Sequence, residues 1–275
     1  MLEDLDAKLA EKYGSHTSYS SEIGPSHIEY YGDSHVEEMK RLLDSYAHGE
    51  ASVLDIGCGA GQTLCRLAQK VRQIWGIDRN DELLQATCLR AKSLGLTNVT
   101  LVQGNSVLEQ DVEQLPDNTF DLAFSQRGPN LNVPLLKKLR KNAFFVQELV
   151  SSYDGYPLRE IFGRTHYTPY IAGEQPMLLA SYAELGLFPV SVKEHFYDVF
   201  YRDIDHLETY LQLSAAMLSN WRLADKPYEP SRDRPALELY ARYNTTPNGI
   251  RIMQHRRIFV LRHVPVYYYP VDGAV

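Results

Sequence analysis

The sequence is poor in cysteine. Its 275 residues include three cysteines, Cys58, Cys65 and Cys88. Their odd number and their spacing fit neither a disulfide framework nor a metal-binding motif. We therefore predict reduced, structural thiols and no bound metal. The chain also lacks internal repeats and low-complexity tracts.

The sequence has no long apolar run and no excess of basic residues. A membrane-spanning helix needs about 18 or more consecutive apolar residues, and no such stretch is present. Residues 1–6 (MLEDLD) are acidic, whereas a secretory leader is basic and then apolar. The formal net charge of −7 disfavours a broad phosphate-binding surface. We expect a soluble, cytoplasmic protein that binds neither nucleic acid nor membranes.

What the sequence does contain is a glycine-rich turn between an apolar run and a helical pattern. Residues 52–56 (SVLDI) suit a strand that is covered on both faces. Gly57, Gly59 and Gly61 follow, and glycine allows a sharp turn and close approach of a ligand to the backbone. Residues 62–71 then carry apolar side chains at helical spacing. This order predicts a nucleotide-binding loop beside a helix N-terminus.

The spacing of the glycines argues against a dinucleotide. A dinucleotide fingerprint places its third glycine three residues after the second, but position 62 is Gln. Asp55, two residues before the glycines, suits a cationic or hydroxyl-bearing ligand better than a pyrophosphate. A second apolar run ends at Asp78, where an acid commonly binds ribose hydroxyls. An NAD-dependent oxidoreductase is therefore the least favoured of the enzyme hypotheses.

Together these segments resemble the class I S-adenosylmethionine-dependent methyltransferases. The resemblance rests on residues 55–61 (DIGCGAG), 76–78 (GID), 103–106 (QGNS) and 120–125 (FDLAFS), and it covers roughly residues 50–150. Two departures from the family pattern are Asn105, where many members have Asp, and residues 140–143 (RKNA), where Lys-Pro-Gly-Gly is common. The second departure concerns a turn that serves the fold rather than the chemistry.

The resemblance implies that S-adenosylmethionine is the cofactor and assigns its contacts. The glycine loop would carry the methionine moiety, Asp78 the ribose, and Asn105 with Ser106 the adenine edge. The full predicted set of cofactor-binding residues is Asp55, Gly57, Gly59, Gly61, Asp78, Arg79, Asn105, Ser106 and Ser125. For each of these residues a purely structural role remains the alternative to cofactor binding. In that interpretation Asp55 orders the loop, Asp78 caps the next helix, and Asn105 and Ser106 form an Asx or Ser turn.

The alternation of strand and helix patterns predicts an α/β fold. We expect a doubly wound, mostly parallel, seven-stranded sheet of the Rossmann-like methyltransferase type, with helical lid insertions. The predicted strands are residues 53–57, 73–78, 99–104, 120–125, 143–149, 190–200 and 250–263. The predicted helices lie near residues 61–71, 81–94, 106–113, 132–140 and 176–185. The basic cluster at residues 137–141 is interpreted as the solvated end of the fourth helix.

Three segments lie outside the minimal core, and we expect them to determine the substrate. Residues 1–49 are predicted to form an N-terminal helical lid, in which Ser34 and Glu37 form a capping box. Residues 50–275 form the cofactor-binding methyltransferase domain, with insertions at about 151–175 and 203–248. Ligands of such sheets bind outside the carboxyl ends of the strands, where the first insertion begins. The predicted substrate-binding residues are Tyr19, Tyr30, Tyr31, Arg127 and Tyr153.

The chemistry that the resemblance implies is in-line displacement at a sulfonium methyl group. The protein must align the nucleophile and exclude water. A base helps where the acceptor is a hydroxyl or an ammonium group, and histidine suits that role. We predict His166, His27 and Arg127 as catalytic candidates in a methyltransferase that acts on an O or N atom of a small molecule. An RNA or protein methyltransferase and a catalytically silent binding module remain the alternatives.

Overall fold

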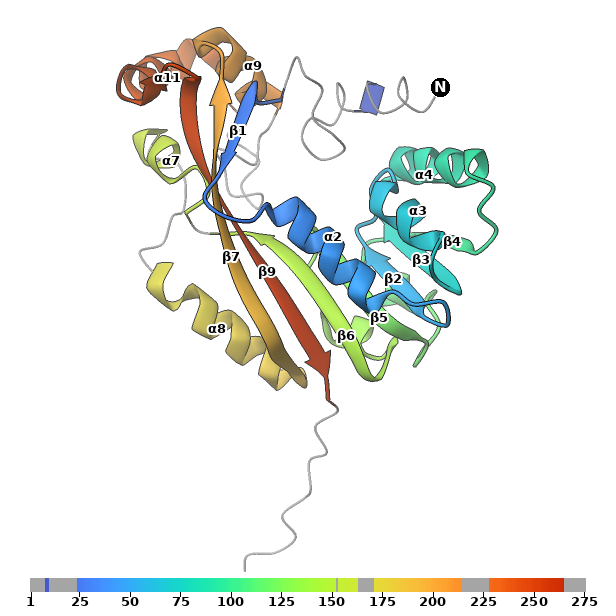
Figure 1. Cartoon of the computed structure of the whole chain (residues 1–275). Coiled ribbons are helices and arrows are strands. Elements are labelled where there is room, and N and C mark those ends of the chain that lie inside the picture. The colour runs from blue at the N-terminus through green and yellow to red at the C-terminus, as the bar shows by residue number, and fades with distance from the viewer. Residues whose placement is uncertain (1–7, 10–23, 152, 163–170, 214–227, 265–275) are drawn as a thin grey trace, which may run out of the picture.

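The computed structural model describes residues 8–9, 24–151, 153–162, 171–213 and 228–264, with the side chains of 171–175 and 213 excepted. It is an α/β structure built on one twisted sheet (Figure 1). The strands are β1 (His27–Tyr30), β2 (Ser52–Ile56), β3 (Gln73–Asp78), β4 (Val99–Gln103), β5 (Phe120–Gln126), β6 (Leu139–Val150), β7 (Leu187–Tyr201), β8 (Thr245–Thr246) and β9 (Gly249–His263). The helices are α2 (His35–Tyr46), α3 (Gln62–Ala68), α4 (Asp81–Ser93), α5 (Glu109–Val112), α6 (Val133–Leu136), α7 (Tyr156–Phe162), α8 (Ile171–Glu184), α9 (Ile204–Leu213) and α11 (Pro230–Asn244).

The sheet has a parallel half and an antiparallel half. Its order is β1-β7-β9-β6-β5-β2-β3-β4, and β8 pairs with β9. The five neighbouring strands from β6 to β4 in this order are parallel, and helical segments connect them along the chain. β9 runs antiparallel between β6 and β7. The α/β class is as predicted, but the described sheet has nine strands rather than seven, because β1 and β8 add to it.

Two apolar layers bury the faces of the sheet. One layer joins α2, α3 and α4 to the face that carries Phe124, Val146 and Ile258. The other joins α5, α6 and α8 to the face that carries Ala123, Phe145 and Phe259. The strands of the parallel half are almost continuously apolar because helices cover them on both sides. None of the helices in the described part of the chain combines the length and the apolar character that crossing a bilayer requires.

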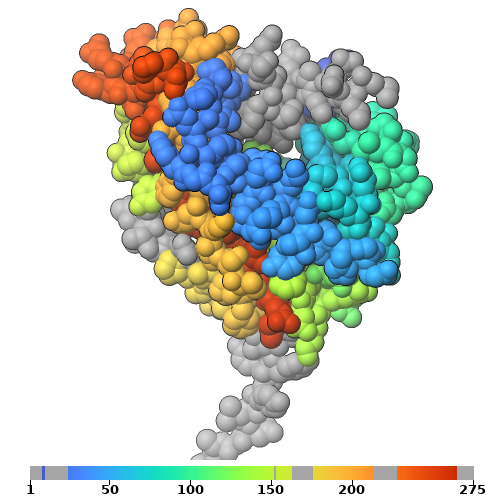
Figure 2. Space-filling model, viewed as in Figure 1, coloured from blue at the N-terminus to red at the C-terminus, as the bar shows by residue number. Residues whose placement is uncertain are grey.

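The described part of the N-terminal segment is integrated into the sheet and does not form a separate lid. Residues 27–30, within the predicted lid, form an edge strand that pairs with β7. α2 packs on β6 and β9, and Figure 2 shows it lying across one face of the molecule. Ser34 is the N-cap residue of α2, but its side chain accepts no capping hydrogen bond, so the predicted capping box is wrong. Residues 1–7 and 10–23 lie outside the described residues, whereas Leu9 is buried against Ala60 of the glycine loop.

The predicted helix at 132–140 is wrong in its second half. α6 ends at Leu136, and β6 already begins at Leu139. Lys138 is 5% exposed, and its ammonium group donates to the carbonyl of Leu115 at 2.7 Å and to Asp117 at 2.5 Å. These partners satisfy the buried charge of Lys138. The basic cluster therefore leads into β6 and does not end a helix, although its members Lys137 and Lys141 are exposed as predicted.

The second predicted insertion packs on an extension of the sheet. β7 and β9 form a long antiparallel pair that reaches beyond the other strands (Figure 1). α7, α9 and α11 surround this extension and form a separate apolar cluster with Tyr201 and Ile252. Residues 163–170 and 214–227, which belong to the two predicted insertions, lie outside the described part of the chain.

Candidate functional site

The glycine loop connects the carboxyl end of β2 to the N-terminus of α3. Gly57, Gly59 and Gly61 have φ angles of 78°, 54° and 77°, a left-handed conformation that side chains disfavour. A Cβ atom on Gly61 would lie 2.4 Å from Cγ2 of Thr87, whereas one on Gly59 would meet nothing within 4 Å. Gly61 is therefore required by packing. Gly59 instead presents a bare backbone to open space, which suits close approach of a ligand.

Asp78 ties this loop to the end of β3. Its Oδ2 accepts a hydrogen bond from the amide of Gly59 at 2.9 Å, and its Oδ1 accepts one from the amide of Asn80 at 2.9 Å. The helix α4 is capped by Asn80, whose side chain accepts from the amide of Leu83. Asp78 is thus not the cap. A carboxylate has about four lone-pair positions, so two remain for ligand hydroxyls.

Asp55 lies beneath the loop and is 4% exposed. Burial, and then the neighbouring carboxylate of Asp78, raise the pKa of Asp55 well above its usual range. Both effects penalise a second negative charge at this position. A cationic ligand group near Asp55 would offset that penalty, whereas a pyrophosphate would increase it. The site therefore fits the sulfonium- and ammonium-bearing cofactor that the resemblance implies.

The segment after β5 packs against the glycine loop. A Cβ atom on Gly128 would lie 2.9 Å from the carbonyl oxygen of Ile56, and one on Gly57 would lie 3.1 Å from Cδ of Pro129. Ser125 is fully buried beneath this contact, and its hydroxyl group has no hydrogen-bond partner among the described residues. The predicted donor-binding residues Gly57 and Ser125 are thus brought together.

Asn105 and Ser106 occupy the turn after β4. Oδ1 of Asn105 accepts a hydrogen bond from the backbone amide of Val107 at 3.2 Å. The backbone amide of Asn105 donates to Oδ2 of Asp111 at 2.7 Å. This is the Asx turn that was the alternative interpretation. Ser106 is buried, and its carbonyl accepts from the side chain of Asn132 at 2.7 Å. A binding role for Asn105 and Ser106 at the adenine edge stays a prediction.

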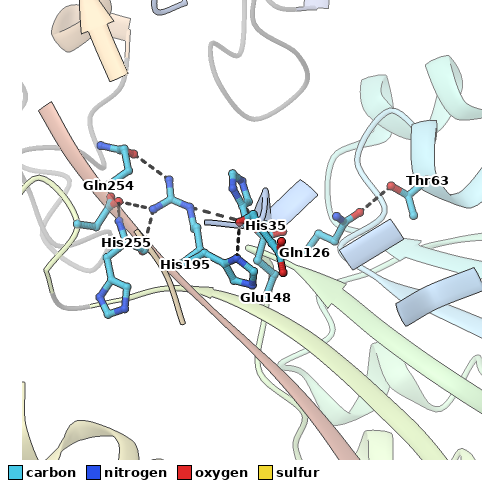
Figure 3. Close-up of polar contacts among 10 residues, drawn as sticks. His35, Thr63, Gln126, Glu148, His195, Gln254 and His255 are labelled. Carbon is cyan, nitrogen blue, oxygen red and sulfur yellow. Dashed lines mark hydrogen bonds and ion pairs between the residues drawn. The ribbon is translucent and has the colours of Figure 1, made fainter. Parts of the chain in front are cut away.

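A buried polar cluster lies at the carboxyl end of β6, which pairs with β5. We define the carboxyl-end cluster as His35, Glu148, His195 and Arg256, which are 8%, 3%, 4% and 4% exposed. They come from α2, β6, β7 and β9, and Figure 3 shows His35, Glu148 and His195 close together. Oε1 of Glu148 lies 3.7 Å from Nε2 of His35 and 4.0 Å from Nε of Arg256.

A short polar path joins the carboxyl-end cluster to the glycine loop. Gln126 is the register partner of Glu148 on the neighbouring strand. Its Oε1 accepts from the hydroxyl group of Thr63, in the first turn of α3, at 2.6 Å (Figure 3). Arg127 follows with a φ of 54°, and its amide donates to the carbonyl of Glu148 at 2.9 Å. The carboxyl-end cluster therefore lies one strand away from the segment after β5 that packs on the glycine loop.

Aromatic rings enclose His35. Its ring stacks on Tyr197 with 4.7 Å between centroids and 15° between planes. Tyr30 lies 5.8 Å from His35 and 5.2 Å from Tyr197. The guanidinium of Arg256 lies 5.6 Å from the centroid of the Tyr197 ring, within the range of a cation–π contact. The histidine is thus held in one orientation beside Glu148.

Burial lowers the pKa of His35 to about 3, and the charges of Arg256 and Arg127 contribute to the shift. Glu148 does not reverse it, because its nearest oxygen is beyond hydrogen-bond distance. Below about pH 6.5, His35 is therefore protonated in the unfolded chain but not in the native state. The free energy of unfolding consequently falls as the pH drops from about 6.5 towards 3.

We expect wild-type protein to lose about 1 kcal/mol more stability between pH 7.5 and 5.5 than His35→Gln does, because one pKa unit corresponds to about 1.4 kcal/mol. Urea unfolding followed by circular dichroism at the two pH values measures this difference. Equal losses in the two proteins would show that His35 is protonated in the native state.

Asp154 anchors the cluster from the loop after β6. It is 2% exposed, forms an ion pair with Arg256, and accepts from the amide of His255 at 2.9 Å. Arg256 also donates to Gln254 at 2.9 Å and to the carbonyl of His255 at 3.0 Å. Arg159 lies 3.8 Å from the other oxygen of Asp154. The start of the predicted 151–175 insertion is therefore a rigid part of the site.

The remaining predicted residues lie in different places. Tyr30 faces the carboxyl-end cluster through its register partner Tyr197, whereas His27 pairs with Phe200 and points to the opposite face of the sheet. The imidazole of His27 is half-exposed and contacts Glu29 at 3.0 Å. Arg79 is exposed. His166 and Tyr19 lie outside the described residues.

Tyr31 and Tyr153 also lie away from the carboxyl-end cluster. The hydroxyl group of Tyr31 donates to Asp198. Asp198 lies between Tyr197 and Val199 on β7, so its side chain points to the face opposite to Tyr197. The ring of Tyr153 packs near Phe196 and His255, which lie on that same opposite face.

Sequence reasoning missed Glu148 and Arg256 and gave no role to His35. A signal was present for each. Glu148 is a charged residue inside a run that otherwise reads as a buried strand, and residues 255–257 (HRR) interrupt the last apolar strand. A charge inside a buried strand requires a partner. The sequence does not show which partner, because α2, β6 and β9 are far apart in the chain.

A surface hollow elsewhere does not compete with this site. It has a volume of about 240 Å³ and is lined by residues that include Tyr46, Asp121 and Phe144. Asp121 lies at the amino end of β5, Phe144 lies in the first half of β6, and Tyr46 ends α2, whereas ligands of such sheets bind at the carboxyl ends of the strands. The part of the chain that the structure describes holds no group of three His, Cys, Asp or Glu side chains placed to bind a metal.

Comparison with known proteins identifies the domain that contains the glycine loop. Residues 47–150 match the model of a methyltransferase domain. This part of the chain is a methyltransferase domain. A structure from Deinococcus radiodurans R1 of unknown function covers 95% of this chain and 100% of its own, with a TM-score of 0.60 and 16% identity. The fold similarity to that protein thus extends beyond residues 47–150, over strands and helices that follow the methyltransferase domain.

Relatives of the methyltransferase domain act on different substrates. A protein-L-isoaspartate O-methyltransferase of Dinoroseobacter shibae is 34% identical over 94 residues, which are 34% of this chain and 42% of that enzyme. The 23S rRNA (uracil(1939)-C(5))-methyltransferase RlmD of Aliivibrio fischeri is 41% identical over 79 residues, which are 29% of this chain and 17% of RlmD. The chain thus spans less than half the length of these relatives, and the shared part is the domain that contains the glycine loop.

Proposed function

We propose that this protein binds S-adenosylmethionine and transfers its methyl group to an O or N atom of a small molecule. The observation that carries the proposal is the state of Gly59. This residue is left-handed, its amide is held by Asp78, and the space where a side chain would stand is open. Packing within the fold does not require a glycine at this position, whereas close approach of a ligand to the backbone does.

The residues of the donor site divide the cofactor between them. The glycine loop and Asp55 would hold the methionine moiety and its positive charges, and the free lone pairs of Asp78 would accept from the ribose hydroxyls. Ser125, buried and without a partner in the described structure, would face the same moiety. When bound, the cofactor supplies a methyl group activated by its sulfonium. The protein has to align the acceptor within about 3 to 3.5 Å and exclude water.

Asp78→Asn is expected to weaken binding of S-adenosylhomocysteine by roughly five- to 150-fold, because a lost hydrogen bond to a buried charged group costs about 1–3 kcal/mol. Isothermal titration calorimetry measures the change. The matched control is Asp81→Asn, which alters an exposed carboxylate three residues later and leaves the affinity unchanged. Equal affinities for all three proteins would remove Asp78 from the site.

A protein or RNA acceptor is the second candidate, because the two relatives described above act on protein and on rRNA. The formal net charge of −7 speaks against an RNA acceptor. Incubating the protein with radiolabelled S-adenosylmethionine and a fractionated cell extract separates the possibilities. The proposal expects the label in the small-molecule fraction. Label in protein or RNA would overturn the choice of acceptor, and binding without transfer to any fraction would indicate a silent module.

A further inference from the structure

We propose that His35, Glu148 and His195 line the methyl-acceptor site and that the acceptor is a neutral, hydroxyl-bearing small molecule. This inference rests on the proposed methyl transfer. Glu148 is one strand away from Gln126 and Arg127, next to the segment that packs on the donor loop. His35 lies directly over Glu148, and its ring is 6.5 Å from that of His195. The three side chains therefore lie where a substrate beside the donor would meet them.

The hydrogen-bonding state of His195 is fixed by its neighbour. Its Nδ1 lies 2.9 Å from the carbonyl oxygen of Asp33. A carbonyl can only accept, so Nδ1 carries the proton, and Nε2 presents a lone pair. This Nε2 is buried and has no hydrogen-bond partner among the described residues. His195 is thus a hydrogen-bond acceptor that lacks a donor.

One acceptor atom of each of the other two side chains also lacks a hydrogen bond among the described residues. Nε2 of His35 faces the carboxylate of Glu148 at 3.7 Å, which favours the tautomer with the proton on Nε2 and the lone pair on Nδ1. Within the described structure, neither Nδ1 of His35 nor Oε1 of Glu148 has a hydrogen-bond partner. Buried polar atoms are normally paired. Three unpaired acceptors at one place call for a ligand that brings hydrogen-bond donors.

The local charges select a hydroxyl group over an ammonium group. Arg256 is buried against the cluster, and the same arginines that lower the pKa of His35, Arg256 and Arg127, would repel a cationic ligand. They would stabilise the negative charge that develops on an oxygen as it loses its proton. Tyr30 and Tyr197 add apolar walls on the same face.

The transfer step balances with these groups alone. The hydroxyl oxygen forms the new bond to the methyl carbon while the carbon–sulfur bond breaks, and that electron pair remains on sulfur. The hydroxyl proton passes to the carboxylate of Glu148, while His35 stays neutral and orients the acceptor through a hydrogen bond to its Nδ1. His195 accepts from a second donor of the acceptor and fixes its orientation. The products are a methyl ether and a neutral thioether.

The test compares benzyl alcohol and catechol with benzylamine, which matches benzyl alcohol in size but is cationic at neutral pH. In protein saturated with S-adenosylhomocysteine, we expect the hydroxyl probes to shift the ring ¹⁵N signals of His35 and His195, and benzylamine to leave them unchanged. With labelled S-adenosylmethionine, we expect slow methylation of a hydroxyl probe. His35→Gln and Glu148→Gln should lower that rate by about 10²-fold or more while binding S-adenosylhomocysteine as wild type does.

The control variant is His263→Gln. His263 also faces a backbone carbonyl, that of Arg140 at 3.1 Å, but it is the last residue of β9, seven residues beyond Arg256. Its replacement should leave the methylation rate and the ¹⁵N shifts of His35 and His195 unchanged. Shifts with benzylamine alone, or with no probe, would overturn the assignment of a hydroxyl acceptor to this cluster. Failure of the wild type to bind S-adenosylhomocysteine in calorimetry would instead overturn the proposed function.

Discussion

Asp154→Ala is expected to lower the free energy of unfolding by about 3–5 kcal/mol, the cost of removing one partner of a buried ion pair. Asp154 and Arg256 are 2% and 4% exposed. The substitution leaves the guanidinium of Arg256 buried, with Glu148 at 4.0 Å as its next carboxylate. It also removes the acceptor for the amide of His255. Urea unfolding followed by tryptophan fluorescence and circular dichroism measures the loss.

Two further variants make this prediction specific. Glu109→Ala breaks the pair of Glu109 with Lys137, which are 60% and 58% exposed, and should change stability by less than about 1 kcal/mol. Asp154→Asn keeps an acceptor for His255 but removes the charge, so a loss close to that of Asp154→Ala is expected. A loss no larger than that of Glu109→Ala would mean that Arg256 finds another partner readily.

Gly61→Ala should destabilise the fold by about 2–5 kcal/mol, whereas Gly59→Ala should mainly abolish cofactor binding. Both residues are left-handed, at φ angles of 77° and 54°, which costs a residue with a Cβ atom about 1–2 kcal/mol. Gly61→Ala adds overpacking of about 1–3 kcal/mol, because its Cβ atom would lie 2.4 Å from Thr87. The Cβ atom of Gly59→Ala enters open space that we assign to the cofactor.

Thermal unfolding and calorimetry with S-adenosylhomocysteine separate the two effects. The double variant Gly61→Ala, Thr87→Ala removes Cγ2 and Oγ1 of Thr87, which would lie 2.4 and 2.7 Å from the new Cβ atom, and should regain part of the stability lost. No recovery would show that backbone strain, rather than packing, makes Gly61 necessary. Wild-type affinity in Gly59→Ala would show that the cofactor does not lie over this glycine.

The donor side of the site is predictable from sequence because its signals are local. The turn from β2 to α3, the acid at the end of β3 and the apolar runs of the parallel strands each occupy a few consecutive residues. Local pattern and local structure agree there, and the α/β class follows. The lengths of the helices agree less well: the helix predicted at 61–71 ends at Ala68.

The acceptor side is not predictable from sequence because its contacts are not local. His35 and Glu148 are 113 positions apart by their numbers, and Arg256 reaches them only through the antiparallel placement of β9 between β6 and β7. The segment 27–30 has only four residues (HIEY), and it forms a strand by pairing with the edge of β7. Propensity does not encode such pairings, since strand formation depends on the neighbouring strand.

The pairing of β1 with β7 has a consequence for how copies of the protein behave at high concentration. An exposed outer strand is a template on which another molecule can add its own strand and start a fibril. β1 occupies residues 197–200 of that edge. Further along the same strand, Pro189 offers no amide proton and Lys193 places a charge at the edge, and both features oppose such growth. A chain shortened to begin after Tyr31 would therefore be more prone to form amyloid-like assemblies than the 275-residue chain.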